Sequence, residues 1–368
     1  MVQELVIHED YHISYTIRFL ENIFLEYQKV MPAPLSERRC IAFVDSALKD
    51  TYADKIVKIL KLHKNHRFIQ FESGESAKNT EVLLEVLTSL DDFGIERRND
   101  IILGIGGGVL TDVVGFAASV YRRGVPFYSV PTTLMGMADA AIGIKNGVNF
   151  NQSKNRLGTF RSPTQVLIDF NFLRTLPDRH ISNGLAEIIK LGIVQSNRVF
   201  DQLYAIPATS AFTNRLDGLL FQLCVSAVET VKQELSGNLI ERELARTLDF
   251  GHTFSPDIEI RHKQILHGEA VAIDMQISTE IAEHRGLLDR EDHARILAIL
   301  NKFNLLKIPI ELRHQDLWDS VIERTAHRGG SQNIPLPCGI GNCVFVQDVT
   351  PSEVMACVGR LNRRVVSR

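Results

Sequence analysis

Short apolar runs alternate with amphipathic stretches over the first part of the chain. The apolar runs have the length and composition of buried strands, and they fall at residues 40–44, 67–71, 100–105 and 125–130. The stretches between them place apolar residues at helical spacing, and they cover residues 53–62, 79–90 and 109–120. Strands that alternate with helices predict βα units around a parallel sheet.

The pattern changes after Leu176-Pro177. Helical periodicity dominates from there on, while strand signals become rare. The predicted helices cover residues 184–194, 219–235, 271–283 and 290–303. We therefore expect an α/β domain over residues 1–178 and a mainly helical domain over residues 179–368.

Composition excludes several classes of protein. The chain has 368 residues with a formal net charge of -3, so it lacks the basic patch of a nucleic-acid-binding protein. No apolar run is long enough to span a membrane, and the N-terminus does not resemble a signal peptide. The five cysteines are odd in number and lack CxxC spacing, which favours a reducing compartment. We expect a cytoplasmic protein without nucleic-acid or membrane partners.

A glycine-rich turn joins the predicted strand at residues 100–105 to the helix that follows it. Its sequence is G-I-G-G-G-V-L-T-D, from Gly104 to Asp112. Glycines before a helix N-terminus let a phosphate approach free backbone N–H groups. The turn does not follow the G-x-G-x-x-G dinucleotide pattern, so alone it fits a tight turn equally well. Asp45, at the end of the first strand, could contact a ribose hydroxyl or could simply be a turn residue.

Two histidines and one glutamate in the second domain are candidate metal ligands. Glu187 lies in a predicted helix, His252 follows Gly251, and His267 precedes an apolar helix. Two imidazoles and a carboxylate form a catalytic zinc-type site when one position is left open. No two of these residues have i, i+3 or i, i+4 spacing, so separate surface or capping roles remain the alternative.

These segments together resemble the dehydroquinate synthase superfamily, the sugar-phosphate cyclases. The shared motifs occur in the same order along most of the chain: Gly74-Glu-Ser-Ala-Lys78, Gly106-Gly-Gly-Val-Leu-Thr-Asp112, Tyr121-Arg-Arg-Gly124, Pro131-Thr-Thr-Leu134, Lys154-Asn155, Phe172-Leu-Arg-Thr-Leu-Pro177, Ala186-Glu-Ile-Ile-Lys190 and the two His motifs. The resemblance implies a Rossmann-like NAD-binding domain followed by a mainly α-helical metal-binding domain. It also implies one divalent metal ion, zinc or cobalt.

The resemblance assigns roles to individual positions. The implied NAD-binding residues are Asp45, Glu75, Lys78, Gly107, Gly108, Asp112, Thr132, Thr133, Lys154 and Thr175. The implied metal ligands are Glu187, His252 and His267. The implied substrate-contacting residues are Asp139, Lys145, Asn155, Lys190 and Lys232. Arg123 resembles an arginine that reaches the neighbouring subunit's substrate phosphate, which implies a homodimer. Without the shared order, the lysines would be solvated surface residues and Asp112 a helix-start charge.

Three departures indicate which branch of the superfamily the chain resembles. Dehydroquinate synthase has a second His, an Arg and an Asn where this chain has Pro256, Ala245 and Asp249. That Arg suits a substrate carboxylate, so its loss points to a substrate without one. The chain instead resembles cyclases of sedoheptulose 7-phosphate. Within them, Leu235, Asp249 and His327 resemble the 2-epi-5-epi-valiolone synthases, with the 2-epi-valiolone synthases as the alternative.

The implied reaction is cyclisation of sedoheptulose 7-phosphate with release of phosphate, which is carbon–oxygen lyase chemistry. It combines transient oxidation by NAD, elimination, reduction and intramolecular aldol closure. Lys145, Lys190 and Arg123 are expected to hold negative charge. Asp249 and His327 are expected to recognise hydroxyls, and Asp249 to orient His252. Less favoured alternatives are a 3-dehydroquinate synthase and a metal-dependent polyol dehydrogenase related to glycerol dehydrogenase.

Overall fold

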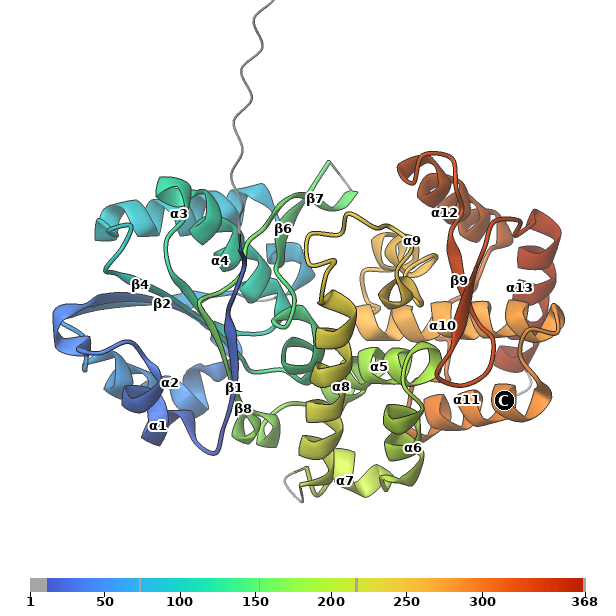
Figure 1. Cartoon of the computed structure of the whole chain (residues 1–368), viewed down its shortest axis with the longest axis horizontal. Helices are drawn as coiled ribbons and strands as arrows, with labels where there is room; N and C mark the ends of the chain where they lie inside the picture. Colours follow the sequence, from blue (N-terminus) through green and yellow to red (C-terminus); the bar gives the residue numbers. More distant parts are fainter. Residues whose placement is uncertain (1–11, 73, 152, 216–217, 367–368) are drawn as a thin grey trace, which may run out of the picture.

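A six-stranded parallel sheet forms the core of the N-terminal half (Figure 1). The computed structural model describes residues 12–366, except 73, 152, 216 and 217. The strand order is β1-β8-β5-β4-β2-β3. The strands are β1 (Thr16–Leu20), β2 (Arg39–Asp45), β3 (Asn65–Phe71), β4 (Ile101–Gly106), β5 (Phe127–Pro131) and β8 (Gln165–Asp169). This is the parallel sheet that the alternating pattern predicts.

Helices cover both faces of this sheet. They are α1 (Ile23–Val30), α2 (Lys49–Leu60), α3 (Thr80–Phe93) and α4 (Gly108–Val120). The side chains of β2 alternate between the two layers: Ala42 and Val44 pack in the cluster that contains α1 and α2, whereas Ile41 and Phe43 pack with α3 and α4. A strand covered on both faces becomes a continuous apolar run, which is why residues 40–44 were readily predicted.

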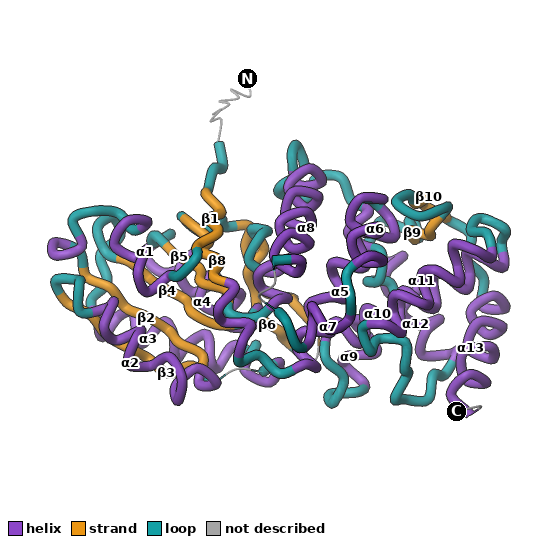
Figure 2. The backbone as a smooth tube through the Cα atoms, turned by 90° about the horizontal axis from the view of Figure 1, so that it is seen from below, coloured by secondary structure: helices purple, strands orange, loops and turns teal. Residues whose placement is uncertain are grey.

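The C-terminal half is mainly helical, and Figure 2 shows it as purple helices joined by teal loops, with orange only at β9 and β10. Its helices are α5 (Asp178–Val194), α6 (Asn197–Ala205), α7 (Ala208–Phe212), α8 (Leu219–Leu235), α9 (Ser255–Arg261), α10 (His267–His284), α11 (Arg290–Lys302), α12 (His314–His327) and α13 (Pro351–Val366). Helices α5 and α10 pack against each other and are buried along most of their length. They provide the rigid support for the candidate metal ligands.

Two antiparallel hairpins complete the fold. Strand β6 (Lys145–Phe150) pairs with β7 (Ser153–Phe160), and β9 (Ile334–Pro337) pairs with β10 (Cys343–Val346). The β6–β7 hairpin packs on α4 and also contacts α9. It therefore connects the two halves of the chain near their junction.

One hydrophobic cluster runs through both halves. It begins with the α1–α2 face of the sheet and continues through residues of α5, α8 and α10. The predicted domain boundary at residue 178 coincides with the first residue of α5, so the boundary lies beside this shared core. The division into two domains remains a prediction. Among the described residues, no helix is both long and apolar enough to cross a membrane.

Candidate metal and nucleotide sites

The three predicted metal ligands meet in space. Glu187 comes from α5, His252 from the loop before α9, and His267 from the first position of α10. Their possible ligand atoms all lie within 4.8 Å of one another. His267 Nε2 is 3.2 Å and His252 Nε2 is 3.7 Å from Glu187 Oε1. The sequence spacing did not require this convergence, and the fold produces it.

Each imidazole is oriented by a hydrogen bond on its other nitrogen. His252 Nδ1 lies 3.1 Å from the carbonyl oxygen of Phe250, and His267 Nδ1 lies 3.0 Å from Glu259 Oε1. Both acceptors hold a proton on Nδ1, so Nε2, which faces Glu187, is the nitrogen that remains to bind a metal ion. Glu259 was not identified from the sequence, because a glutamate in an amphipathic helix has no distinguishing signal.

Glu187 is almost completely buried, with 1% of its side chain exposed. Burial opposes its ionisation, but Lys190 and the two imidazoles outweigh burial and hold the pKa of Glu187 well below its usual range. Among the described residues, neither carboxylate oxygen makes a hydrogen bond of regular geometry. A buried, ionised carboxylate beside two Nε2 atoms fits a zinc-type ion.

The loop that carries His252 packs on α10 and is hydrogen bonded to it. Gly251 has φ 77°, and a Cβ there would lie 2.8 Å from Val271 of α10. Glycine is therefore required both by the left-handed backbone and by the close approach. Beyond His252, the backbone N–H groups of Phe254 and Ser255 donate to the buried carboxylate of Asp274, also on α10. The loop and His267 thus share one helix as their support.

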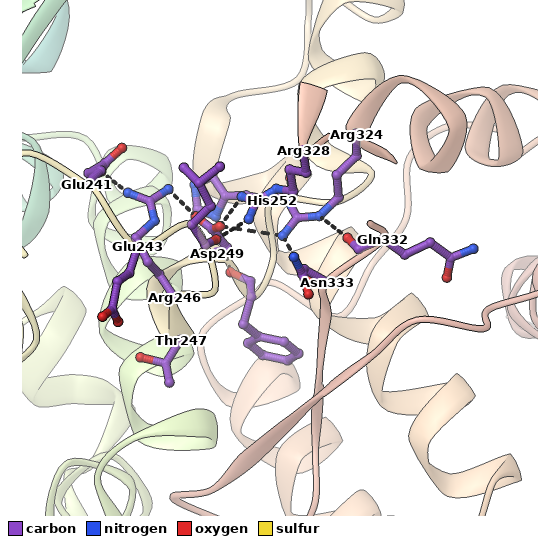
Figure 3. Close-up of polar contacts among 12 residues, drawn as sticks. Glu241, Glu243, Arg246, Thr247, Asp249, His252, Arg324, Arg328, Gln332 and Asn333 are labelled. Carbon is purple, nitrogen blue, oxygen red and sulfur yellow. Dashed lines mark hydrogen bonds and ion pairs between the residues drawn. The ribbon is translucent and has the colours of Figure 1, made fainter. Parts of the chain in front are cut away.

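The predicted role of Asp249 in orienting His252 needs a correction. Its carboxylate does not hydrogen bond to the His252 imidazole, which donates to the carbonyl oxygen of Phe250 instead. Figure 3 shows it surrounded by Arg246, Arg324 and Arg328. Burial opposes ionisation, but these guanidinium groups lower the pKa of Asp249. Asp249 is thus the shared counter-ion of three arginines, none of which the sequence pattern singled out.

Five predicted nucleotide-binding residues follow the carboxyl ends of neighbouring strands. Asp45 ends β2, Gly107 and Gly108 follow β4, and Thr132 and Thr133 follow β5. The chain leaves β2 toward β3 and returns to β4 on the other side, so β2 and β4 flank a topological switch point, where open α/β sheets bind ligands.

The start of α4 lies at this edge. Gly107 is its N-cap, and its first N–H groups have no side-chain cap, as an anion site requires. A Cβ on Gly107 would lie 3.2 Å from Thr133, so glycine keeps this corner tightly packed.

The other predicted nucleotide residues surround this edge. Lys78 and Asp112 form an ion pair at 2.5 Å. Burial opposes the charge of Lys78, but Asp112 and Glu75 raise its pKa. Lys154 Nζ lies 3.1 Å from Glu75 Oε1. Thr175 follows β8 and bonds through Oγ1 to the carbonyl oxygen of Phe172 at 3.3 Å.

Three predicted substrate residues lie around the metal cluster. Lys190 forms an ion pair with Glu187. Burial and then the negative charge of Glu187 raise the pKa of Asp139. Lys145 pairs with Glu241, and the side chain of Lys145 is 59% exposed. Burial of its ammonium and the nearby charge of Arg246 lower the pKa of Lys145 to about 8.

The remaining predicted residues are more exposed. Asn155 has φ 51° in the β6–β7 hairpin. His327 ends α12 with 53% of its side chain exposed, 3.5 Å from Glu323. Lys232 is exposed in the last turn of α8, where its ammonium has no partner among the described residues. Arg123 is exposed beyond the C-terminal end of α4.

Family models match both halves of the chain. The model of the 3-dehydroquinate synthase N-terminal region matches residues 68–183, and that of the C-terminal region matches residues 184–326. A 2-epi-5-epi-valiolone synthase of Streptomyces hygroscopicus subsp. jinggangensis is 41% identical, over 89% of this chain and 81% of its own length. A demethyl-4-deoxygadusol synthase of Trichormus variabilis is 32% identical, over 94% of this chain and 87% of its own.

A solved structure has nearly the same fold. The 2-epi-5-epi-valiolone synthase of Streptomyces hygroscopicus subsp. jinggangensis, with NAD+ and Zn2+ bound, superposes with a TM-score of 0.92 and 39% identity, covering 98% of this chain and 100% of its own. This chain belongs to the 3-dehydroquinate synthase family of sugar-phosphate cyclases.

Proposed function

We propose that this chain cyclises sedoheptulose 7-phosphate to 2-epi-5-epi-valiolone and releases phosphate. One observation carries the proposal: the Glu187–His252–His267 cluster belongs to a chain 41% identical to a 2-epi-5-epi-valiolone synthase over 89% of its length. Identity to the demethyl-4-deoxygadusol synthase is lower, at 32%, which favours the valiolone branch. The reaction class is a carbon–oxygen lyase.

The two candidate sites fit NAD and one divalent metal ion. Glu187, His252 and His267 offer the two nitrogens and one carboxylate of a catalytic zinc-type site with an open position. The uncapped start of α4 and the glycines beside it suit a pyrophosphate. A bound metal would polarise a substrate hydroxyl, and bound NAD+ would accept a hydride and later return it. NAD is therefore not consumed overall.

Side chains of this chain supply charge and positioning. Lys190 lies next to Glu187, where its ammonium stabilises negative charge that develops on a substrate oxygen. Lys145 has a pKa of about 8, so it is mostly protonated at neutral pH and would attract a phosphate. Asp139 has a raised pKa, which suits a carboxyl group that exchanges a proton with the substrate.

The substrate of the proposed reaction has no carboxylate. Ala245 offers no group to bind one, and Asp249 carries negative charge where the neighbouring arginines would otherwise attract one. Asn155, His327 and Lys232 are retained as proposed substrate contacts. Substituting each of them would test its specific role.

A homodimer completes the proposal. Helix α4 has 13 residues, so its ends are about 20 Å apart. Its first residue is Gly108 at the nucleotide edge, whereas Arg123 lies beyond its last turn. Arg123 is thus far from that edge in its own chain and is free to reach the phosphate in a neighbouring subunit. Val120 is 43% exposed beside it, as suits a surface that becomes covered. The two-domain division at residue 178 and a cytoplasmic location are proposed with it.

The test is turnover of sedoheptulose 7-phosphate by the purified chain with NAD+ and zinc or cobalt. Phosphate release, NADH absorbance and the NMR spectrum of the product are followed together. We expect phosphate release without net NADH, and 2-epi-5-epi-valiolone as the product. Arg198→Ala is the control, because Arg198 is 71% exposed in a surface ion pair with Glu229 and should keep full activity.

Other products would contradict the proposal in distinct ways. The 2-epi-valiolone isomer would move the chain to the neighbouring branch. Stoichiometric NADH from a polyol would indicate a dehydrogenase. Dehydroquinate formed from a heptulosonate phosphate would show that Ala245, Asp249 and Pro256 do not exclude a carboxylate.

A further inference from the structure

A chain of charged contacts runs from the metal cluster to the nucleotide edge. His267 Nδ1 lies 3.0 Å from Glu259 Oε1. The other oxygen of Glu259 pairs with Lys154 Nζ, which also lies 3.1 Å from Glu75 Oε1. Glu259 lies on α9, Lys154 on β7 and Glu75 in the turn after β3. The contacts therefore cross from the helical half to the sheet half.

Glu259 is the central member of this chain. Its side chain is 6% exposed, and each of its two oxygens has a different cationic or donor partner. A buried carboxylate of this kind has a fixed position, because loss of either partner leaves a charge uncompensated.

The nucleotide edge lies within electrostatic range of the same group. Glu75 and Glu259 both act to raise the pKa of Lys78, which pairs with Asp112. Contacts from His267 through Glu259 and Lys154 to Glu75 thus join the metal cluster to the nucleotide edge.

We propose that Glu259 is a positioning residue shared by the two cofactor sites, so that the metal ion and NAD bind cooperatively. Fixing His267 for the metal also fixes Glu259, Lys154 and Glu75. A nucleotide that arrives second then meets an already ordered Lys154 and Glu75, and the ordering cost is not incurred again. The inference rests on the proposed use of both cofactors, and it adds a thermodynamic link between them.

The test measures NAD+ affinity by calorimetry in chelator-treated and zinc-loaded protein. For the wild-type chain we expect zinc to tighten NAD+ binding by roughly 5-fold to 150-fold, the usual range of such coupling. By linkage, NAD+ must tighten zinc binding by the same factor. This reciprocal measurement is an internal check that does not depend on turnover.

Two substitutions break the link at different contacts. Glu259→Gln keeps an acceptor for His267 Nδ1–H but loses the charge that holds Lys154. Lys154→Met removes the bridge itself and weakens NAD+ binding in both states. In each variant we expect the ratio between zinc-loaded and metal-free NAD+ affinities to fall to about 1, because no coupling free energy remains.

The matched control is Glu269→Gln. Glu269 is also on α10, two residues from His267, and it pairs with Arg179. The substitution therefore breaks a nearby ion pair that is not part of the chain of contacts. Its affinity ratio should equal that of the wild type. A wild-type ratio of 1, or an unchanged ratio in both Glu259→Gln and Lys154→Met, would overturn the proposal. Coupling without turnover of sedoheptulose 7-phosphate would refute the cyclase assignment alone.

Discussion

Two buried carboxylates of the helical half have opposite surroundings. Glu187 has Lys190 and two imidazoles beside it and no regular hydrogen bond among the described residues. Asp249 is held by Arg246, Arg324 and Arg328 (Figure 3). Imidazoles can give their Nε2 lone pairs to a metal, whereas guanidinium groups stay charged and only donate. One carboxylate is therefore available as a ligand, and the other is an anchor.

The largest expected effect is at the available carboxylate. Glu187→Gln keeps the shape of the side chain but removes its charge, so the zinc-type donor set loses its anion. We expect zinc affinity and phosphate release to fall by more than ~100-fold, the upper end for residues that only support a ligand. Metal analysis after dialysis and the phosphate assay check this. A Glu187→Gln protein that keeps one zinc per chain would remove Glu187 from the ligand set.

At the anchor, the main effect should be on stability. Asp249→Ala leaves three mostly buried arginines without their shared counter-ion, which should cost about 3–5 kcal/mol in the free energy of unfolding. Urea unfolding measures this, with Asp249→Asn as the variant that keeps hydrogen-bond acceptance. Unchanged stability combined with lost zinc would mean that Asp249 belongs to the metal site after all.

A buried histidine of the sheet half also contributes to acid unfolding. Its effect on the free energy of unfolding has to be known before the pH dependence is assigned to the two carboxylates. His63 is buried and bonds to the hydroxyl of Tyr27, and burial lowers the pKa of His63 to about 4. Because the unfolded chain binds the proton more readily, the stabilising contribution is complete above about pH 6.5 and is lost as pH falls toward 4. We expect a loss of roughly 3 kcal/mol over this window.

Replacing this histidine isolates its contribution. His63→Gln keeps a hydrogen-bonding group for Tyr27 but does not titrate. Its unfolding free energy should vary less between pH 6.5 and pH 4 than that of the wild type, as measured by urea unfolding at several pH values. The same slope in both proteins would assign the acid sensitivity to other groups.

The smallest expected effect concerns Arg324, a side chain that contacts both regions. Arg324 Nη1 donates to the carbonyl oxygen of His252 at 3.4 Å, and Arg324 Nη2 lies 3.5 Å from Asp249 Oδ2. Arg324→Lys cannot make both contacts with a planar fork, so we expect zinc affinity to fall about 10-fold. Competition with a chelator measures it. An unchanged affinity would show that the two carboxylate regions act independently.

The sequence predicted best those helices and strands that carry a long apolar run or a regular apolar period. Strand β2 and helix α8 (Leu219–Leu235) are long enough and apolar enough for their periodicity to identify them. The β6–β7 hairpin was not predicted, because β7 is polar and mostly exposed. Edge strand β1 and the short helix α9 likewise offer too few buried positions for a period to appear.

For the site, the order of motifs identified the ligands but not their supports. Glu187, His252 and His267 come from separate elements, and only the fold brings them together. Glu259 and Arg324 contact residues that are distant in the sequence, and neither lies in a motif. Asp249 does not orient His252, because three arginines surround its carboxylate, and a sequence does not reveal such neighbours. Its predicted recognition of substrate hydroxyls stays a prediction.

The position of β1 affects how the protein forms on the ribosome. Among the strands that the structure describes, β1 pairs only with β8, which also separates it from β5. Thr16 meets its partner Gln165 roughly 150 positions later, which at ~5–20 residues per second is about 7–30 s of translation. During that interval β1 has no neighbour and the β5 edge is open, so nascent chains are most exposed to aggregation before β8 emerges.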